Sequence, residues 1–554
     1  MIRYGKNKAF LAVIFGTIAL LLVAVVNGQP FYFPDTTNYM READAAVVWV
    51  FGSRFATSWT DSSVAKKLDQ NFIEPTNPSA AVDGTTVNSA SSTSTLRSEH
   101  TNSLQSGVIL SGRSVYYGFL LYLGELGGGF WLTVILQAMT VSYVLYLVSV
   151  RCFHLSLKIF LLAISMLACF STAPFFVGFL MPYIFAAVAI LATGVFVAFW
   201  NDITRFEKIV LAILLVYSLL GHLSHLLICI LMFAVYIALS ASSRFRVHYF
   251  RLACASTIAA CVLLGAGGEI AFNAVVSKIL GTSPITPPLV MARLINLGPG
   301  LKYLQAHCNQ SHFVICRYQD RLPLDTDSFI WSYDPAVGIF APASPEVKRA
   351  LSDEQFSFAL HVFEFDPAGV LYKMLRAGIS QLTTFGLDEF RNKDGQWAYY
   401  SARLPRKYWN AMQGTVAFQD GWIVDMMSKL DTLVVILSCL FLVFVRTRYS
   451  NISKHVALKN SNFVGSQKLF IAIVGVGIVC NAFVCGGLSS IHSHYQARVV
   501  WLVPFIAMLV FAELFVVAEK KERFSAGTRG HSVDNETLTK IGHFEAAVQA
   551  NDKY

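Results

Sequence analysis

Charged residues are scarce in this sequence. Of its 554 residues only 14% are Asp, Glu, Lys or Arg, whereas average soluble domains carry about 25%. A soluble chain of this length would fold as several domains, and these charges are too few to cover their surfaces. The same numbers exclude a disordered chain, a collagen and a small disulfide-rich scaffold. The class of protein that these numbers leave is one that crosses a membrane several times.

The sequence also lacks the common short catalytic motifs. It contains no Walker phosphate-binding loop, no GxSxG, no HExxH and no CxxC. Neither ATP-driven transport by this chain alone nor serine or zinc proteolysis is therefore supported. Eight of the ten cysteines lie in or beside apolar stretches and are interpreted as small hydrophobic residues. The exceptions are Cys308 and Cys316, which fall in a polar region with seven residues between them.

Apolar residues are in excess and make up 55% of the chain. Runs of about 17–25 apolar residues are long enough to cross a bilayer. We find ten candidates, near residues 9–27, 130–150, 158–173, 182–199, 208–221, 226–240, 252–268, 429–445, 469–486 and 499–517. We therefore expect an all-α polytopic membrane protein with about ten transmembrane helices, within a range of eight to eleven. The length of the first run favours an uncleaved anchor over a signal peptide.

The distribution of Lys and Arg gives the chain a direction in the membrane. If the N-terminus is cytoplasmic, nearly all of the Lys and Arg residues in the short segments beside the spans lie inside, and the short outside segments carry one, Arg498. Because cytoplasmic loops are enriched in Lys and Arg, we expect both termini in the cytoplasm, and the compact architecture favours a bacterial inner membrane. The expected divisions are a first helix (1–28), an outside segment (29–129), spans two to seven (130–268), a second outside segment (269–428), spans eight to ten (429–517) and a cytoplasmic tail (518–554).

Two long segments are thus predicted to face outward. In the first, residues 58–106 are rich in Ser, Thr and Asn and predict a flexible insertion. The glycine-broken residues 107–129 predict helices at the membrane surface. The second segment predicts a mixed, mainly helical domain, and its 15 acidic and 14 basic residues exclude a basic nucleic-acid surface. In this oxidising compartment a local disulfide between Cys308 and Cys316 is the leading prediction.

Asp35 is the strongest candidate for a catalytic residue. It stands eight residues after Asn27, the end of the first apolar run, which places it at the outer boundary where a lipid headgroup lies. A carboxylate there could act as a general base on an acceptor hydroxyl, or could hold a divalent cation. No other cofactor is suggested. The alternative is a structural one, because Asp before a helical run is a preferred N-cap.

His222 and His225 form a second candidate cluster at the tight outside turn between two predicted spans. Two histidines three residues apart can share one helix face and reach a metal, a phosphate or a hydroxyl. Ionisable residues near a membrane interior are costly, which favours a function for them. The alternative is a pair of polar turn residues that the backbone satisfies.

A third cluster precedes the last predicted span and contains His494, Gln496 and Arg498. Arg498 breaks the positive-inside pattern, and a guanidinium at that depth suits a bidentate contact with a lipid phosphate. An interfacial arginine that extends to water is the alternative. Arg113 lies between Gly112 and Ser114, in the segment that leads to the second predicted span. It would either meet a headgroup or cap a helix.

These residues resemble motifs of the GT-C superfamily of membrane glycosyltransferases. The similar stretches are Pro34 to Tyr39 after the first span, Gly112 to Gly118 before the second, and Tyr495 to Arg498 before a late span. Such enzymes are multi-span helical proteins that transfer sugar from a polyprenyl-phosphate carrier outside the cytoplasmic membrane. The resemblance implies that Asp35 is the base, that Arg498 binds the carrier phosphate, and that the acceptor is an envelope glycan, a lipid or a protein. Candidate helpers in binding are His222, His225, His494, Gln496 and Arg113.

Two other classes of function stay open. One is a transporter or flippase of lipid-linked saccharide, for which mid-bilayer charges are expected and few are found. The other is a non-catalytic envelope-assembly protein in which residues 269–428 bind a partner. The GT-C family also often has a second acidic residue in a later outside loop, where this chain has Tyr183.

Overall fold

The structure is a computed structural model that describes residues 6–60, 113–391 except 282, 400–452 except 402 and 420, and 461–514. Within these residues the regular elements are helices, and an isolated bridge pairs Phe31 with Phe179. The predicted flexible insertion at 58–106, apart from its first three residues, lies outside the described residues. The predicted cytoplasmic tail at 518–554 also lies outside them.

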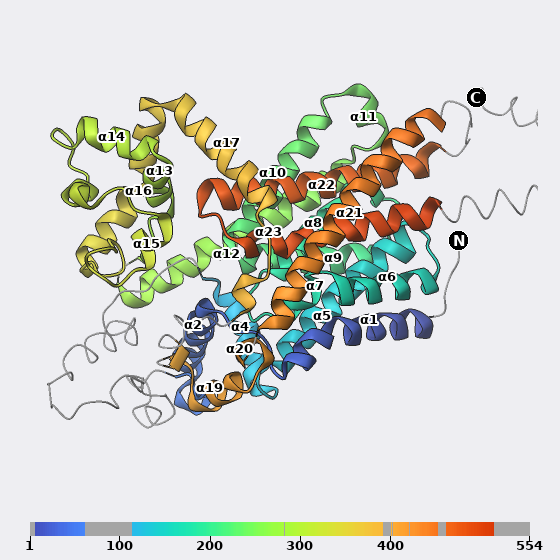
Figure 1. The fold of residues 1–554 in the computed structure, drawn as a ribbon, viewed down its shortest axis with the longest axis horizontal. Helices are drawn as coiled ribbons and strands as arrows, with labels where there is room; N and C mark the ends of the chain where they lie inside the picture. Colours follow the sequence, from blue (N-terminus) through green and yellow to red (C-terminus); the bar gives the residue numbers. More distant parts are fainter. Residues whose placement is uncertain are drawn as a thin grey trace, which may run out of the picture.

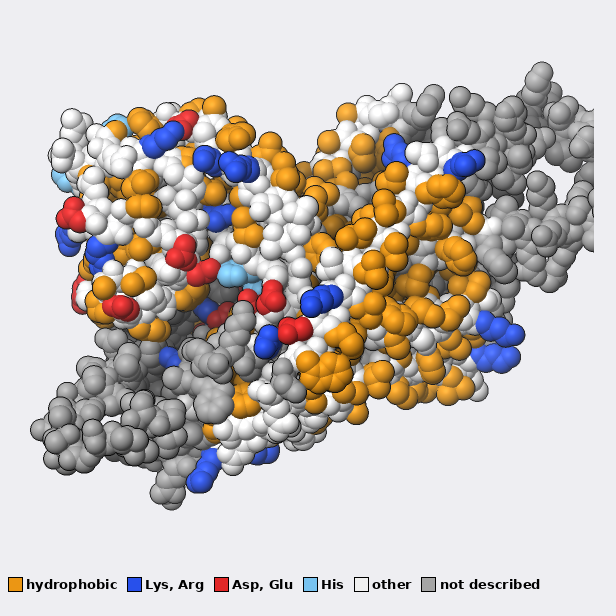
Figure 2. Space-filling model, viewed as in Figure 1, with side chains coloured by type: hydrophobic (Ala, Val, Ile, Leu, Met, Phe, Trp, Pro, Cys, Tyr) orange, Lys and Arg blue, Asp and Glu red, His pale blue; other side chains and the backbone are white. Residues whose placement is uncertain are grey.

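Six helices in the described part of the chain are long and apolar enough to cross a membrane. They are Asn7–Asn27, Trp131–Cys152, Leu252–Lys278, Trp422–Arg448, Gly465–Leu488 and Ser493–Leu514. Apolar side chains dominate the visible surface of the half of the molecule that contains α1, α6 and α21 (Figure 2). An apolar surface of this extent is typical of a protein surrounded by lipid. The chain is therefore a helical membrane protein, as its composition predicts.

These six helices do not show the expected count of about ten spans. Leu157–Phe170, Ile184–Phe199 and Leu223–Leu239 are apolar but have 14, 16 and 17 residues, fewer than the roughly 20 that a bilayer needs. Every residue of Ile184–Phe199 is buried by neighbouring parts of the protein. A helix buried on all sides is apolar for that reason alone. Hydropathy therefore does not separate a membrane crossing from a core helix here.

The bundle comprises the long apolar helices and those between them. In chain order its helices are α1 (Lys6–Asn27), α5 (Trp131–Tyr146), α6 (Leu157–Phe170), α7 (Ala173–Val177), α8 (Ile184–Phe199), α9 (Arg205–Gly221), α10 (Leu223–Leu239), α11 (Ser243–His248), α12 (Leu252–Leu280), α21 (Trp422–Ile452), α22 (Ser461–Leu488) and α23 (Ser493–Val500). Helix α8 is central and packs against α5, α9, α10 and α22. Helices α1, α5 and α6 pack along one flank (Figure 1).

Two helices of the first outside segment pack together at one end of the bundle. They are α2 (Pro34–Phe51), followed by the short turn η1 (Ser53–Phe55), and α4 (Val115–Leu126), which lies within the predicted surface-helix region. Ser114 is the N-cap of α4, because its hydroxyl oxygen accepts a hydrogen bond from the backbone N–H of Tyr117 at 3.2 Å. This cap fixes where the chain turns into α4.

A second, smaller core lies beside the bundle. It is built by α13 (Leu289–Leu297), α14 (Pro299–His307), η4 (Val314–Arg321), α15 (Thr326–Trp331), α16 (Pro345–Phe365) and part of α17 (Pro367–Thr383). We call residues 283–383 the peripheral domain, which stands apart from most of the bundle in Figure 1. In the structure a disulfide joins Cys308 and Cys316, whose Cα atoms are 5.4 Å apart. Helix α17 packs along α22 and so attaches the domain to the bundle.

The rest of the second outside segment packs into the bundle. Its elements are η5 (Asp388–Phe390), α19 (Arg406–Gln413) and α20 (Val416–Gln419), and their buried side chains join the main core. The ring of Phe390 lies 5.2 Å from that of Phe31 and 4.5 Å from that of Phe179, centroid to centroid. Residues 269–428, predicted as one outside domain, are thus divided between two cores.

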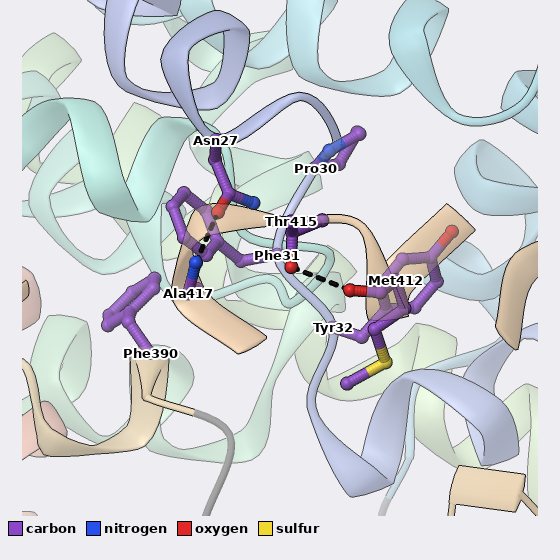
Figure 3. Close-up of a pocket in the computed structure, with 8 residues that line it drawn as sticks. All are labelled: Asn27, Pro30, Phe31, Tyr32, Phe390, Met412, Thr415 and Ala417. Carbon is purple, nitrogen blue, oxygen red and sulfur yellow. Dashed lines mark hydrogen bonds between the residues drawn. The ribbon is translucent and has the colours of Figure 1, made fainter. Parts of the chain in front are cut away.

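A small recess lies between the end of α1 and the segment that contains α19 and α20 (Figure 3). Its lining residues are Asn27, Pro30, Phe31, Tyr32, Phe390, Met412, Thr415 and Ala417. The Ala417 N–H donates to Asn27 Oδ1 at 3.0 Å, and the Thr415 hydroxyl donates to the Met412 carbonyl at 2.7 Å. Because these polar groups bond to each other, the recess is a packing feature of the fold.

Candidate functional site

Asp35 lies in the first turn of α2 but is not the N-cap of that helix. The N-cap is Phe33, whose backbone N–H donates to the hydroxyl of Thr36 at 3.0 Å. The Thr36 hydroxyl in turn donates to the Leu180 carbonyl at 2.9 Å, which docks the start of α2 on the loop before α8. The Asp35 carboxylate instead pairs with the guanidinium of Arg113 and keeps 28% of its side chain exposed. A capping role therefore does not account for Asp35.

Arg113 connects the start of α2 with the peripheral domain. Its guanidinium pairs with Asp35, and its centre lies 4.9 Å above the ring of Trp331 in α15. The Arg113 Nε atom has no hydrogen-bond partner among the described residues. Two turns further along α2, burial raises the pKa of Glu42 to about 8, an effect that Arg113 opposes and Asp35 reinforces. The result is a group of interacting charges at the junction.

Arg498 is fully buried. It therefore does not extend to water, which is what the alternative interpretation as an interfacial arginine predicts. Its Nε and Nη2 atoms donate to Asn481 Oδ1 at 3.0 and 2.8 Å, and Nη2 also donates to the Ser224 hydroxyl at 3.0 Å. Its Nη1 atom has no hydrogen-bond partner, and no carboxylate forms an ion pair with it, among the described residues. A buried charge normally has a counter-charge. An anionic ligand would supply one here.

Tyr183 joins the Asp35 and Arg498 regions. Its ring stacks on His494 with centroids 5.3 Å apart, lies 5.8 Å from the ring of His222, and is 5.3 Å from the Arg498 guanidinium centre. The predicted residues His222, His494 and Arg498 therefore surround one tyrosine, and Phe33, two residues before Asp35, contacts the same ring with centroids 6.5 Å apart.

His222 takes part in this cluster in its neutral form. Burial, and then the positive charges of Arg498 and Arg113, lower the pKa of His222 to about 3. Its Nδ1 atom accepts from the backbone N–H of Ser224 at 3.1 Å and lies 2.8 Å from the Ser224 hydroxyl. With Nδ1 as acceptor, the proton of the neutral ring is on Nε2, which is then available as a donor.

His225 and Gln496 have structural contacts that weaken their predicted roles. Nδ1 of His225 lies 2.9 Å from the Ser218 carbonyl, so that the ring is fastened to the end of α9. The amide oxygen of Gln496 accepts from Asn481 Nδ2 at 2.9 Å, and its amide nitrogen donates to the Ile478 carbonyl at 3.5 Å. Gln496 therefore bonds α23 to α22, and we leave it out of the ligand set below.

A group of residues that could hold a metal ion includes His494, which stacks on Tyr183. Ligand atoms of Glu389, His492 and His494 all lie within 4.8 Å of one another. His492 Nε2 is 3.0 Å from Asp327 Oδ2. Burial alone would raise the pKa of Asp327, but the hydrogen bond from His492 lowers it below its ordinary value. Figure 2 shows histidine and acidic side chains together where the peripheral domain meets the bundle.

Comparison with known proteins does not identify a relative. The chain matches no protein-family model, no curated protein and no solved structure. The roles of Asp35, Arg113 and Arg498 therefore depend on their own geometry and chemistry.

Sequence reasoning missed several residues of the site. The sequence marks Tyr183 only because it occupies a position where the GT-C family often has a second acidic residue. Asn481 is an amide inside an apolar run, and a polar residue in a membrane helix is itself a signal of function. Ser224 lies between the two predicted histidines. Nothing local marks Glu389 or Asp327, because only the packing of α15 and η5 against the start of α23 brings them close.

Proposed function

We propose that this protein is an integral membrane glycosyltransferase that transfers a sugar from a polyprenyl-phosphate carrier to an envelope glycan, lipid or protein acceptor. One observation carries the proposal. Arg498 is a buried guanidinium with an unpartnered Nη1 atom and no ion-pairing carboxylate among the described residues, and it lies against Tyr183, whose ring also contacts Phe33 at the start of α2. A phosphate oxygen is the ligand that a guanidinium prefers.

The donor phosphate is placed against Arg498 and His222. The Arg498 Nη1 atom and the Nε2–H of neutral His222 would donate to phosphate oxygens, while Asn481 and Ser224 hold the guanidinium in place. Fixed donors in a site that excludes water stabilise the negative charge that develops on a leaving phosphate. This arrangement would favour departure of the carrier phosphate over binding of the intact donor.

Asp35 is the general base in this proposal. Its carboxylate takes the proton of the acceptor hydroxyl as the acceptor oxygen forms a bond to the anomeric carbon. The bond between that carbon and the phosphate oxygen breaks, and the carrier phosphate leaves with the electron pair. Arg113 orients the Asp35 carboxylate through their ion pair. A general base of this kind contributes about 10²–10⁴-fold to a rate.

The proposal includes a bacterial inner membrane, cytoplasmic termini and about ten spans. The additional crossings would be α6, α8, α9 and α10, beside the six long apolar helices. The asymmetry of Lys and Arg between the short loops supports this orientation. Glycosyl transfer would then take place on the outer side of the membrane, where Asp35 and Arg498 are expected.

The test compares Asp35→Asn and Arg498→Ala with two matched controls, Asp320→Asn and Arg446→Ala, whose side chains are exposed. Each variant replaces the wild-type protein in cells, its membrane abundance is measured, and lipid-linked and surface glycans are profiled. Both site variants are expected to lose the glycan product while both controls retain it. Wild-type glycans from the two stably expressed site variants would rule out the catalytic role.

A second measurement separates transfer from transport. The purified protein in detergent is given a short-chain polyprenyl-phosphate sugar and an acceptor extract, and release of polyprenyl phosphate is followed. A transferase releases it without a closed membrane, whereas a flippase needs vesicles and leaves the donor intact. An envelope-assembly protein would do neither.

A further inference from the structure

Three side chains near the start of α23 have the composition of a metal site. Glu389 comes from η5, and His492 and His494 come from the turn into α23. Their ligand atoms lie within 4.8 Å of one another, and Oε1 of Glu389 is 3.4 Å from Nδ1 of His494. Ligands of a tetrahedral zinc ion lie roughly 3.3–3.5 Å apart when each bond is about 2.0–2.1 Å. The Glu389–His494 pair already has this spacing, and a small movement of the His492 ring would complete it.

His494 is a second and independent observation that points to a ligand. Its side chain is only 3% exposed, its Nε2 atom has no hydrogen-bond partner among the described residues, and its Nδ1 atom has only the 3.4 Å contact with Glu389 Oε1. Leaving a buried polar atom without a partner is energetically costly. The ring cannot turn freely to find one, because it packs between Phe33 at 5.6 Å and Tyr183 at 5.3 Å. A metal ion bound to one nitrogen would remove part of this cost.

Asp327 supplies the outer contact that metal-binding histidines usually have. Its Oδ2 atom lies 3.0 Å from His492 Nε2 and also accepts from the Ser490 hydroxyl at 2.8 Å. A carboxylate that accepts the Nε2–H of a histidine fixes the tautomer with a lone pair on Nδ1. Asp327 thus prepares His492 to bind a metal through Nδ1.

We propose that Glu389, His492 and His494 bind one Zn²⁺ ion, or a similar borderline transition-metal ion, with Asp327 orienting His492. Two imidazoles and one carboxylate suit zinc better than magnesium or calcium, which prefer oxygen ligands. Three protein ligands leave a fourth position open, as in catalytic zinc sites. The Glu389 and His492 side chains are 23% and 29% exposed, so an ion can enter from solvent.

This metal site goes beyond the proposed glycosyl transfer and does not depend on it. The residues proposed for that reaction include His494 but neither Glu389 nor His492, and the sequence predicts a divalent cation at Asp35 instead. Asp35 is paired with Arg113 in the structure, whereas Glu389 and the two histidines face one another. The test below measures metal binding directly, so its result is independent of any sugar transfer.

The experiment uses the full-length protein, purified in detergent without a polyhistidine tag and dialysed against micromolar Zn²⁺. The wild type is expected to retain one zinc ion per chain, and to show visible absorption of tetrahedral Co²⁺ when cobalt replaces zinc. Glu389→Gln, His492→Gln and His494→Gln are each expected to weaken zinc binding at least 100-fold. Asp327→Asn is expected to weaken it about 10–100-fold. The control His361→Gln, in α16 of the peripheral domain, should bind zinc as the wild type does.

The melting temperature of each variant without zinc shows whether it folds. Because the His492 side chain is partly exposed, we expect the His492→Gln variant to fold even if substitution of the buried His494 prevents folding. Added zinc should raise the melting temperature of the wild type and of His361→Gln, but not that of the ligand variants. A wild type that retains no zinc, or folded ligand variants that retain as much as the wild type, would overturn the proposal.

Discussion

Two buried arginines contact helix α22, and their surroundings differ. Arg293, in α13 of the peripheral domain, donates from Nε and Nη2 to the Gly486 carbonyl and from Nη1 to Asn296 Oδ1 at 3.0 Å. Gly486 is in the last turn of α22, where carbonyls lack helical partners and a positive charge is favourable. Each side-chain nitrogen of Arg293 therefore has a hydrogen-bond partner.

Arg498 contacts α22 through the side chains of Asn481 and Cys485. It is more deeply buried than Arg293, at 0% against 5% exposed, yet its Nη1 atom has no partner among the described residues. The comparison teaches that burial alone does not mark a functional charge. Arg293 has the contacts that a structural attachment requires, whereas the contacts of Arg498 hold it in place and leave one donor available for a ligand.

The largest effect is expected from Arg498→Met. This change removes the donor that we propose binds the carrier phosphate, and we expect the transfer rate to fall about 100-fold or more. The loss of the Arg498 hydrogen bonds destabilises the fold, whereas the removal of a buried charge without a counter-charge among the described residues stabilises it. These two effects oppose each other, so the free energy of unfolding should change little. Polyprenyl-phosphate release and thermal unfolding in detergent measure the two quantities. A variant whose activity falls only in proportion to its folded fraction would make Arg498 a structural residue like Arg293.

Arg293→Met should give the opposite pattern. The Gly486 carbonyl loses its charged donor, and the free energy of unfolding should fall by about 1.5–3 kcal/mol. The folded fraction should still transfer sugar at close to the wild-type rate, since Arg293 does not contact the Tyr183 cluster in the structure. Thermal unfolding and specific activity per folded molecule check this. A selective loss of activity without destabilisation would contradict the contrast between the two arginines.

Ligand binding sharpens the comparison further. Polyprenyl phosphate at about ten times its dissociation constant should stabilise the wild type by about 1.4 kcal/mol. The same addition should stabilise Arg293→Met equally and leave Arg498→Met unchanged, because only the second variant lacks the phosphate donor. The shift in melting temperature with added lipid is the measurement. Equal shifts in both variants would show that the phosphate binds elsewhere.

The smallest effect is expected from Arg151→Gln, at a third arginine that has a carboxylate partner. Arg151 Nε lies 2.9 Å from Glu207 Oε1, and both side chains are partly exposed, so the change should cost less than about 1 kcal/mol at neutral pH. Burial would raise the pKa of Glu207, but the bonds from Arg151 and Thr204 lower it below its ordinary 4.5. The stabilisation is present above pH 4.5 and is lost as the pH falls through the lower native value. The difference in melting temperature between variant and wild type should therefore shrink on acidification.

Several features of this protein follow from the sequence by itself. The scarcity of charge and the long apolar runs determine a helical membrane protein, because lipid requires every backbone polar group to be bonded within the segment. The position of Asp35 shortly after the first run, and the appearance of Arg498 among apolar residues, depend only on local order along the chain. Each is a matter of spacing, which the linear sequence carries in full.

Tertiary structure decided which of these residues meet. Asp35 pairs with Arg113 across 78 positions of sequence, and Arg498 reaches Ser224 across 274. The division of 269–428 between two cores, and the burial of α8 within the protein, likewise depend on which apolar faces pack together. Hydropathy is the same for a side chain that faces lipid and one that faces another helix. Only the packed bundle distinguishes them, and only there does Arg498 keep an open donor beside Tyr183.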